Sequence, residues 1–346
     1  MLLKKLTEVH GVSGNEDAVR KLIIEEIKNY ADEIKIDVLG NVIAMKNIHQ
    51  KGPKLMLSAH MDEIGLMVVG IEKNGLLKFR TVGGIDERIL VSKQVEIGAK
   101  NIPGVIGAKA IHLQKSQERT IPIPVDQLYI DIGAQTQEEA EKAVMIGDYV
   151  SFASEYQEMG TNYVKGKAFD DRVGCAVLIE MLKKSHAIPL YAVFTVQEEI
   201  GLRGATVAAH SVDPEIALII EGTTASDVVG TEKHHYVTQL GKGPALSVMD
   251  RGMIANHHFN RYVTEIAEES GIPVQIREGA SGGNDAGRIH LHKAGVLTGV
   301  LSIPVRYIHS PHSMIHLQDY EHLLRLTDIF IEQLSNGRGI GNETDN

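Results

Sequence analysis

Several ionisable side chains in this sequence stand where apolar, strand-like runs end. These runs are KLMLSAH, which ends in His60; YAVFTVQEE, which ends in Glu198 and Glu199; EIALIIE, which ends in Glu221; and GVLSIPVRYIH, which ends in His309. Asp170 stands where a loop leads into a predicted helix. Imidazole nitrogens and carboxylate oxygens are ligands for divalent ions, and two ions held about 3.5–4 Å apart can share a carboxylate. The set therefore predicts a site for two metal ions.

Each of these motifs also has an ordinary structural explanation. A single histidine after a strand is more often structural than a metal ligand, Asp170 could simply cap its helix, and two adjacent glutamates are usually a solvated pair. Their common position at strand ends argues against this explanation for the whole set. Adjacent acids directly after a long apolar run cost desolvation free energy unless a positive charge compensates them. We therefore interpret the set as one site.

The elements that position these residues are those of an α/β fold. The apolar runs are typical of buried strands in an open sheet, where ligands bind just beyond the carboxyl ends of the strands. Helix patterns alternate with them, from DRVGCAVLIEMLKK to the amphipathic C-terminal segment LQDYEHLLRLTDIFIEQL. The capping-box pattern from Ser13 to Glu16 predicts a helix over residues 15–30, and IKIDV and VIAM predict a hairpin. We expect a mixed, parallel-rich sheet flanked by helices.

Residues 67–165 have a different pattern. Short alternating runs lie between glycines and prolines, namely LKFRTV, VEIGA, GVIGA, KAIHL, LYIDIG and DYVSFA, and a capping box from Thr136 to Glu139 predicts one helix. Because candidate site residues lie on both sides, we expect residues 1–66 and 166–346 to form the catalytic domain and residues 67–165 a small β-rich insertion. A length of 346 residues fits two domains, since a single core seldom exceeds roughly 250–300 residues.

Composition excludes several classes of protein. The formal charge of −10 comes from 45 acidic and 35 basic residues, which argues against nucleic acid or an anionic membrane as partner. Nowhere do about 18 apolar residues run together, and the N-terminus has no apolar signal region. The single cysteine, Cys175, excludes an intrachain disulfide and a thiolate metal site, and we expect it in the core. We expect a cytoplasmic protein.

Six segments together resemble those of a known family. They are AHMDEIG, KAFDDRVG, QEEIGLRGA, IIEGTTASDVVG, GGNDAG and RYIHSP. In this order they resemble the tetrahedral or glutamyl aminopeptidase family of dinuclear metallopeptidases, over nearly the whole chain. The resemblance implies a metal-dependent aminopeptidase that acts on short peptides and binds two divalent ions per subunit, zinc or cobalt. Some members of this family are labelled endoglucanases.

Carried over residue by residue, the resemblance implies a role for each candidate ligand. Asp170 would bridge the two ions, with His60 and Glu221 completing one ion and Glu199 and His309 the other. Many members carry Asp where this chain has Glu221, and the extra methylene leaves the ligand geometry and the preferred ion open. Asp62 would orient the imidazole of His60 and raise its basicity.

The implied mechanism assigns proton transfer to Glu198. Two ions polarise the scissile carbonyl and acidify a water; Glu198 takes the proton of that water and delivers it to the leaving amine. One ion can also hold the free α-amino group of the substrate, which would make the enzyme exo-acting.

Three functional alternatives remain open beside this one. A glycosidase needs two carboxylates and no metal pair, so the histidines would go unexplained. A related deacylase could use the same metals. A peptide-binding protein with an inactive site is disfavoured, because all the implied ligands and the implied base are present.

The preferred N-terminal residue of the substrate also stays open. An acidic preference would need a cation such as Arg251 or Arg306 in the pocket. An apolar preference would use Met249, Met253 or Ile254.

Two pairs of adjacent histidines lie outside the predicted site, His234-His235 and His257-His258. Because neighbouring side chains diverge on a helix or strand, we expect at most one of each pair to face a shared ion.

The family resemblance also implies an assembly. Members form dimers that build a hollow tetrahedral dodecamer with inward-facing active sites. By analogy, the β-rich insertion is the expected dimer contact.

Overall fold

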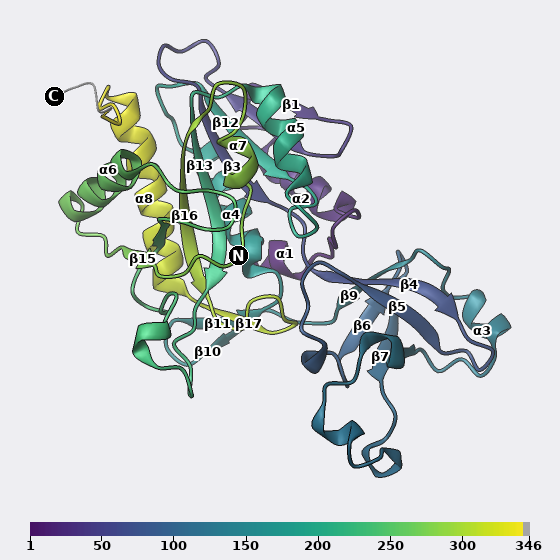
Figure 1. Cartoon of the computed structure of the whole chain (residues 1–346). Helices are drawn as coiled ribbons and strands as arrows, with labels where there is room; N and C mark the ends of the chain where they lie inside the picture. Colours follow the sequence, from purple (N-terminus) through teal and green to yellow (C-terminus); the bar gives the residue numbers. More distant parts are fainter. Residues whose placement is uncertain (342–346) are drawn as a thin grey trace.

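An eight-stranded mixed sheet forms the centre of the molecule, which the computed structural model describes over residues 1–341 (Figure 1). The strand order is β1-β2-β12-β3-β13-β16-β14-β15. Their bounds are β1 Glu33–Ile36, β2 Val42–Lys46, β3 Leu55–His60, β12 Leu190–Thr195, β13 Ile216–Thr224, β14 Ala245–Ser247, β15 Gln275–Arg277 and β16 Leu297–Val305. The four central strands β12, β3, β13 and β16 are parallel, whereas β1, β2 and β14 introduce antiparallel pairs. The prediction of a mixed, parallel-rich α/β sheet is confirmed.

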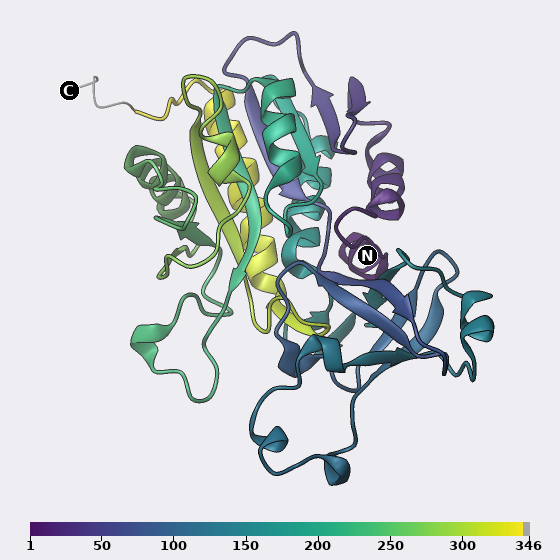
Figure 2. The same ribbon diagram turned by 45° about the vertical axis from the view of Figure 1, so that its right-hand side comes forward.

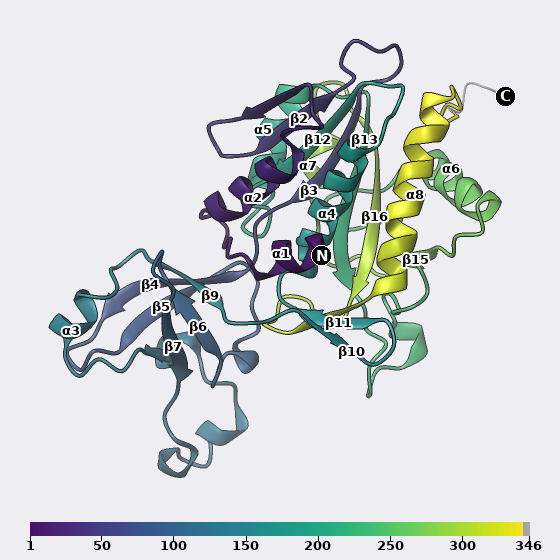
Figure 3. The same ribbon diagram turned by 180° about the vertical axis from the view of Figure 1, so that it is seen from behind.

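Helices cover both faces of this sheet. They are α1 Leu2–Glu8, α2 Asp17–Ile27, α4 Phe169–Lys183, α5 Arg203–Val212, α6 His257–Glu269, α7 Ala286–Ile289 and α8 Leu317–Ser335. The view from behind shows α2, α4 and α8 in front of the sheet (Figure 3), and the opposite view shows α5 and α7 (Figure 1). Each face has its own apolar core, with Phe169 and Cys175 in the larger one and Ala205 and Ile289 in the smaller one.

A closed six-stranded barrel lies beside the sheet and its helices (Figure 2). Its strands are β4 Gly65–Ile71, β5 Leu77–Val82, β6 Gln94–Ile97, β7 Ile102–Gly107, β8 Tyr129–Asp131 and β9 Tyr149–Phe152. The barrel has a separate apolar core that includes Leu66, Phe79 and Ile130. Helix α3, Gln137–Glu141, begins as predicted, because the Thr136 hydroxyl accepts a hydrogen bond from the Glu139 N–H. The predicted β-rich character of this segment is therefore confirmed.

A three-stranded sheet connects the end of the barrel segment to the C-terminal part of the chain. Strands β10 (Gln157–Met159) and β11 (Tyr163–Gly166) form a hairpin, and β11 also pairs with β17 (Ser313–His316). Because β17 directly precedes α8, this small sheet ties the return from the barrel to the part of the chain that carries His309.

Two local sequence predictions are wrong. Ser13 does not cap the first long helix: Glu16 occupies the N-cap position of α2, and the Ser13 hydroxyl instead donates to Asp62, 2.6 Å away. The run KAIHL is not a strand but leads into a short 3₁₀ turn, Ile111–Leu113, within the long connection between β7 and β8. Ser13 is held by its contact with Asp62, which the local pattern does not contain. Ile111 and Leu113 are exposed, so this run has no buried face of the kind that an alternating strand presents to a core.

A buried ionic cluster fixes the segments around the candidate metal ligands. Arg172 on α4 is fully buried and donates to the carbonyls of Leu6, Val9 and Met61. Its guanidinium also lies 3.4 Å from Glu63, which accepts two further hydrogen bonds from Lys167 at 2.6 and 2.8 Å. The cluster therefore joins the end of α1, the loop after β3 and the start of α4.

No helix within residues 1–341 is long and apolar enough to cross a membrane.

Candidate metal centre and active site

The parallel strands bring the predicted site residues to one edge of the sheet. His60 is the last residue of β3, where it pairs in register with Thr195, the last residue of β12. Glu198 and Glu199 follow β12 directly, Glu221 lies in the second half of β13, and His309 follows β16. Since these strands run parallel and adjacent, their carboxyl ends meet at the same edge (Figure 1).

Asp170, near the start of α4, lies between two histidines. Its Oδ1 is 3.0 Å from Nε2 of His60, and its Oδ2 is 3.3 Å from Nε2 of His309. Nε2 of each histidine also faces a second carboxylate: Glu221 Oε1 lies 3.3 Å from His60 Nε2, and Glu199 Oε2 lies 3.2 Å from His309 Nε2. Two ligand clusters therefore share one carboxylate.

These separations fit metal coordination. Ligand atoms about 2.0–2.2 Å from a tetrahedral ion lie about 3.3–3.6 Å from one another, close to the observed 3.0–3.3 Å. The second oxygen of Glu221 is buried and has no hydrogen-bond partner among the described residues. The donor set of imidazoles and carboxylates suits borderline and hard divalent ions.

The negative charge of the buried carboxylates also favours the binding of cations at this site. Burial and the neighbouring acids raise the pKa of Glu198 and of Glu221 well above the usual range. Burial, together with the charge of Asp170, raises the pKa of Glu199 to about 7 although His309 opposes this. Burial disfavours protonation of His309, but the Asp170 hydrogen bond and the Glu199 charge outweigh it and raise the pKa to about 9. When several carboxylates are buried close together, positive charge has to compensate the hydration that their ionised forms lose.

Asp62 supports the site in two ways. Its own carbonyl lies 3.1 Å from Nδ1 of His60 and its carboxylate 3.5 Å from the same nitrogen, which leaves Nε2 free to face Asp170. The carboxylate also accepts hydrogen bonds from the backbone N–H groups of Glu198 (3.0 Å) and Glu199 (3.2 Å). Asp62 thus holds both a candidate metal ligand and the segment that carries the candidate base.

A cavity of about 300 Å³ opens beside the two clusters. Asp170, Glu198, Glu221 and His309 line one part of its wall. Because Glu198 faces this space next to the candidate ligands, it is placed where a substrate and a water could both reach it.

Two buried carboxylates near the site were not singled out from the sequence. Asp171 offers an oxygen close to ligand atoms of His60 and Glu221, all within 4.8 Å of one another. Asp285 accepts a hydrogen bond from the Thr195 hydroxyl, and burial raises its pKa to about 6. A signal existed for both, because Asp171 is adjacent to Asp170 and Asp285 belongs to the GGNDAG segment.

The residues considered for substrate preference do not line the cavity. The Arg306 guanidinium is bound by both oxygens of Asp227, at 2.8 and 2.6 Å, and Arg251 lies outside the lining. Met249, Met253 and Ile254 are also absent from the lining. In their place the wall contains Arg277 and Asp250, which the sequence patterns did not reveal.

The sequence patterns of known families match this chain over most of its length. The pattern of the M42 glutamyl aminopeptidases matches residues 40–326, and a second pattern, AMPT, matches residues 1–22. The chain belongs to the M42 glutamyl aminopeptidase family. The members of this family are hydrolases of the exopeptidase class, so the predicted family and class of enzyme are confirmed.

Relatives of known description match nearly the whole chain. A putative aminopeptidase of Acetivibrio thermocellus is 42% identical over 327 residues, which are 94% of this chain and 96% of the relative. A lysyl aminopeptidase of Pyrococcus furiosus is 36% identical over 343 residues, which are 96% of each chain.

Solved structures of TET aminopeptidases have the same fold. That of the marine sediment archaeon Thaumarchaeota archaeon SCGC AB-539-E09 superposes with a TM-score of 0.93 at 37% identity, covering 98% of both chains. The dodecameric PhTET1-12s superposes with a TM-score of 0.84 at 37% identity, covering 95% of this chain and 97% of that one.

Proposed function

We propose that this M42 family member is an aminopeptidase that uses two divalent metal ions, zinc or cobalt, and Glu198 as general base to remove N-terminal residues from short peptides. The observation that carries the proposal is Asp170, whose two oxygens face two different histidines, each with its own second carboxylate. The proposed ligands are His60, Asp170 and Glu221 for one ion and Asp170, Glu199 and His309 for the other.

The side chains around the cavity have different roles in the proposed hydrolysis. When bound, the ions supply polarisation of the scissile carbonyl and a more acidic water. Glu198, in the cavity wall, accepts a proton from the attacking water at its carboxylate and donates it to the leaving amine. Asp62 keeps this carboxylate in place through the backbone N–H of Glu198. It also fixes the ring of His60 so that Nε2 points to the centre.

The geometry argues against one alternative function, and substrate tests separate the other. A glycosidase would use a pair of carboxylates that flank the scissile bond of a sugar. The two histidines that flank Asp170 would then have no role in the reaction. A deacylase with the same ions would differ only in the bond cleaved, so it is separated by substrate tests and not by the ligand set.

We further propose the assembly that the family resemblance implied and the location that we expected from the sequence. The resemblance between this chain and the dodecameric PhTET1-12s structure supports a homododecamer built from dimers. In this proposal residues 67–165 form the inserted domain that makes the dimer contact, residues 1–66 and 166–346 form the catalytic domain, and the enzyme works in the cytoplasm.

The decisive experiment compares free and blocked N-termini. Protein stripped of metal is titrated with zinc or cobalt and assayed on a panel of aminoacyl-anilides and their N-acetylated counterparts. We expect activity that requires metal and disappears on acetylation. Hydrolysis of the acetylated compounds alone would indicate a deacylase, and an enzyme that binds no metal would contradict the proposal.

The cavity wall supports a preference for acidic N-terminal residues. The half-buried Arg277 guanidinium donates to neutral acceptors, the Thr223 hydroxyl at 2.9 Å and backbone carbonyls such as that of Met249. Burial lowers its pKa although the charges of Asp250 and Glu221 oppose this. The oxygens of Asp250 already accept three hydrogen bonds from groups other than Arg277. Arg277 is therefore the charged group in the wall that is best placed to bind a substrate carboxylate.

Replacement of Arg277 by Gln tests this preference. We expect kcat/KM for glutamyl- and aspartyl-anilides to fall about 10- to 100-fold relative to alanyl-anilide, because a hydrogen bond to a charged group contributes roughly 1.5–3 kcal/mol. Arg251→Gln is the matched control and should leave the ratio unchanged, since Arg251 lies outside the cavity lining. Fastest hydrolysis of lysyl- or leucyl-anilide by the wild type would refute the assignment of Arg277 without affecting the proposed reaction.

A further inference from the structure

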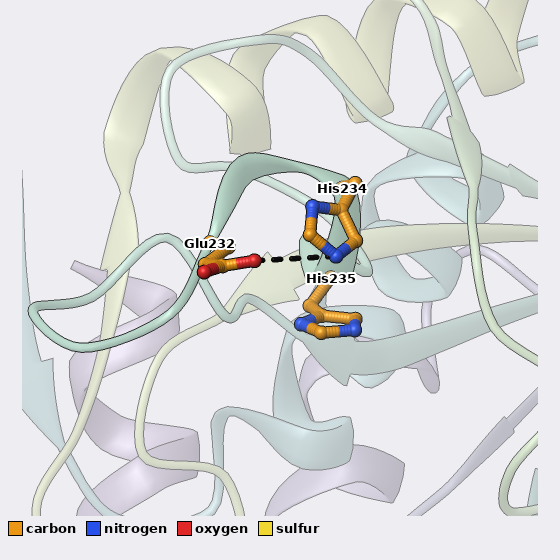
Figure 4. A group of neighbouring side chains, drawn as sticks. All are labelled: Glu232, His234 and His235. Carbon is orange, nitrogen blue, oxygen red and sulfur yellow. Dashed lines mark ion pairs between the residues drawn. The ribbon is translucent and has the colours of Figure 1, made fainter.

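A second group of side chains that can bind metal lies on a surface turn that follows the IIEGTTASDVVG segment. The 3₁₀ turn Lys233–His235 lies in the connection between β13 and β14, and Glu232 directly precedes it. Figure 4 shows the Glu232 carboxylate and the imidazoles of His234 and His235 gathered on one side of this turn. Each side chain offers one ligand atom, and these three atoms lie within 4.8 Å of one another.

The two histidines approach each other despite being neighbours in sequence. Their ring centroids are 4.0 Å apart with an angle of 50° between the planes. The expectation that adjacent side chains diverge is therefore wrong here, because it holds for regular helices and strands and not for this turn. The rings of His257 and His258, at the start of α6, also lie close together, with centroids 3.9 Å apart.

The geometry of the group fits a borderline divalent ion. Nε2 of His234 lies 3.4 Å from Oε2 of Glu232, the separation expected for two ligands of one tetrahedral ion. The ligand atom of His235 lies within 4.8 Å of the other two, and its exposed side chain can rotate toward them. His234 and Glu232 are 68% and 74% exposed, so coordination costs little desolvation.

The backbone of the turn is held in place before any ion binds. The N–H of His235 donates to the carbonyl of Glu232 at 2.8 Å, and the Ser226 hydroxyl donates to the carbonyl of His235 at 3.1 Å. The same hydroxyl accepts from the N–H of Val237 at 2.8 Å. Because the backbone is already ordered, metal binding has to fix only side-chain rotamers, which limits the entropic cost.

We propose that Glu232, His234 and His235 form a third metal site, separate from the catalytic pair and selective for borderline transition ions such as zinc. Two imidazoles and one carboxylate supply three ligands, and water fills the open position. Lys233 lies within the same turn and adds a positive charge, so we expect micromolar rather than tighter affinity.

The test counts metal ions per chain. Full-length wild type and the variant His234→Ala/His235→Ala are dialysed against zinc over the micromolar range, and bound metal is measured by elemental analysis. We expect the wild type to bind one more zinc per chain than the variant. The variant should keep the wild-type rate on peptide substrates, because these residues take no part in the proposed reaction.

A matched control uses the other histidine pair. His257→Ala/His258→Ala should bind as many ions as the wild type, because the ring of His258 faces the Arg261 guanidinium and not a carboxylate. Glu232→Gln should weaken the third ion about tenfold, a loss of ~1.4 kcal/mol. Equal zinc content in the wild type and the His234/His235 variant, a difference seen only at millimolar zinc, or loss of the ion in the His257/His258 control would overturn the proposal.

Discussion

Glu198→Gln protein is expected to retain both metal ions and to lose turnover by about 10²- to 10⁴-fold, the range for removal of a positioned general base. Glutamine keeps the size of the side chain and the backbone N–H that donates to Asp62, so the geometry of the site should persist. It cannot accept the proton from the attacking water. The measurements are kcat on an aminoacyl-anilide and the metal content of the same preparation.

The paired variant is Asp170→Asn, which is expected to lose activity and metal together. Asp170 contacts both histidines, and its replacement removes the one carboxylate that the two ligand clusters share. A Glu198→Gln enzyme with near-normal rates would show that another group is the base. An Asp170→Asn protein with two tightly bound ions would show that the ligand assignment is wrong.

Arg172→Met is expected to destabilise the protein by about 3–5 kcal/mol, the range observed when one partner of a buried ion pair is removed. Arg172 is fully buried, and its hydrogen bonds to the carbonyls of Leu6, Val9 and Met61 would all be lost. The shift of the denaturant midpoint measures the effect. Arg261→Met is the control, because Arg261 is 63% exposed and its contacts with Glu265 and His258 lie on the surface. This change should alter stability by less than about 1 kcal/mol.

The same cluster predicts a pH dependence. Burial by itself would raise the pKa of Glu63, but the charges of Lys167 and Arg172 outweigh it and hold the pKa below its usual value. A carboxyl whose pKa is lowered in the folded state stabilises the fold above its unfolded pKa and loses this contribution as the pH falls through its folded pKa. The stability difference between wild type and Glu63→Gln should therefore be constant near neutral pH and shrink below about pH 4.5. A difference that grows on acidification would contradict the predicted shift.

The local sequence determined the strands and much of the candidate site. Long apolar runs such as EIALIIE are typical of strands that are buried on both faces of a sheet. The parallel arrangement then places the residues that follow these strands at one edge. His60, Glu199, Glu221 and His309 could be singled out for this reason. The Thr136 cap could be predicted as well, because both of its partners lie within one turn of helix.

Predictions failed where a side chain finds its partner far along the chain. Ser13 has the sequence position of a cap, but it donates to Asp62, 49 residues away. Arg306 is a suitable cation for a substrate pocket by type, but it is bound by Asp227, 79 residues away. No local pattern encodes such a pairing, because it depends on how distant segments are brought together.

The sequence by itself thus determined the fold class, the β-rich segment and the residue types of a candidate metal site, since all three follow from periodicity and from the residues at the ends of apolar runs. Only the tertiary structure decided that Asp170 lies between His60 and His309, that Asp62 holds the Glu198 backbone, and that Arg277 lines the cavity. The reason is physical: coordination, hydrogen bonding and charge pairing act over a few ångströms in space, whatever the separation of the residues along the chain.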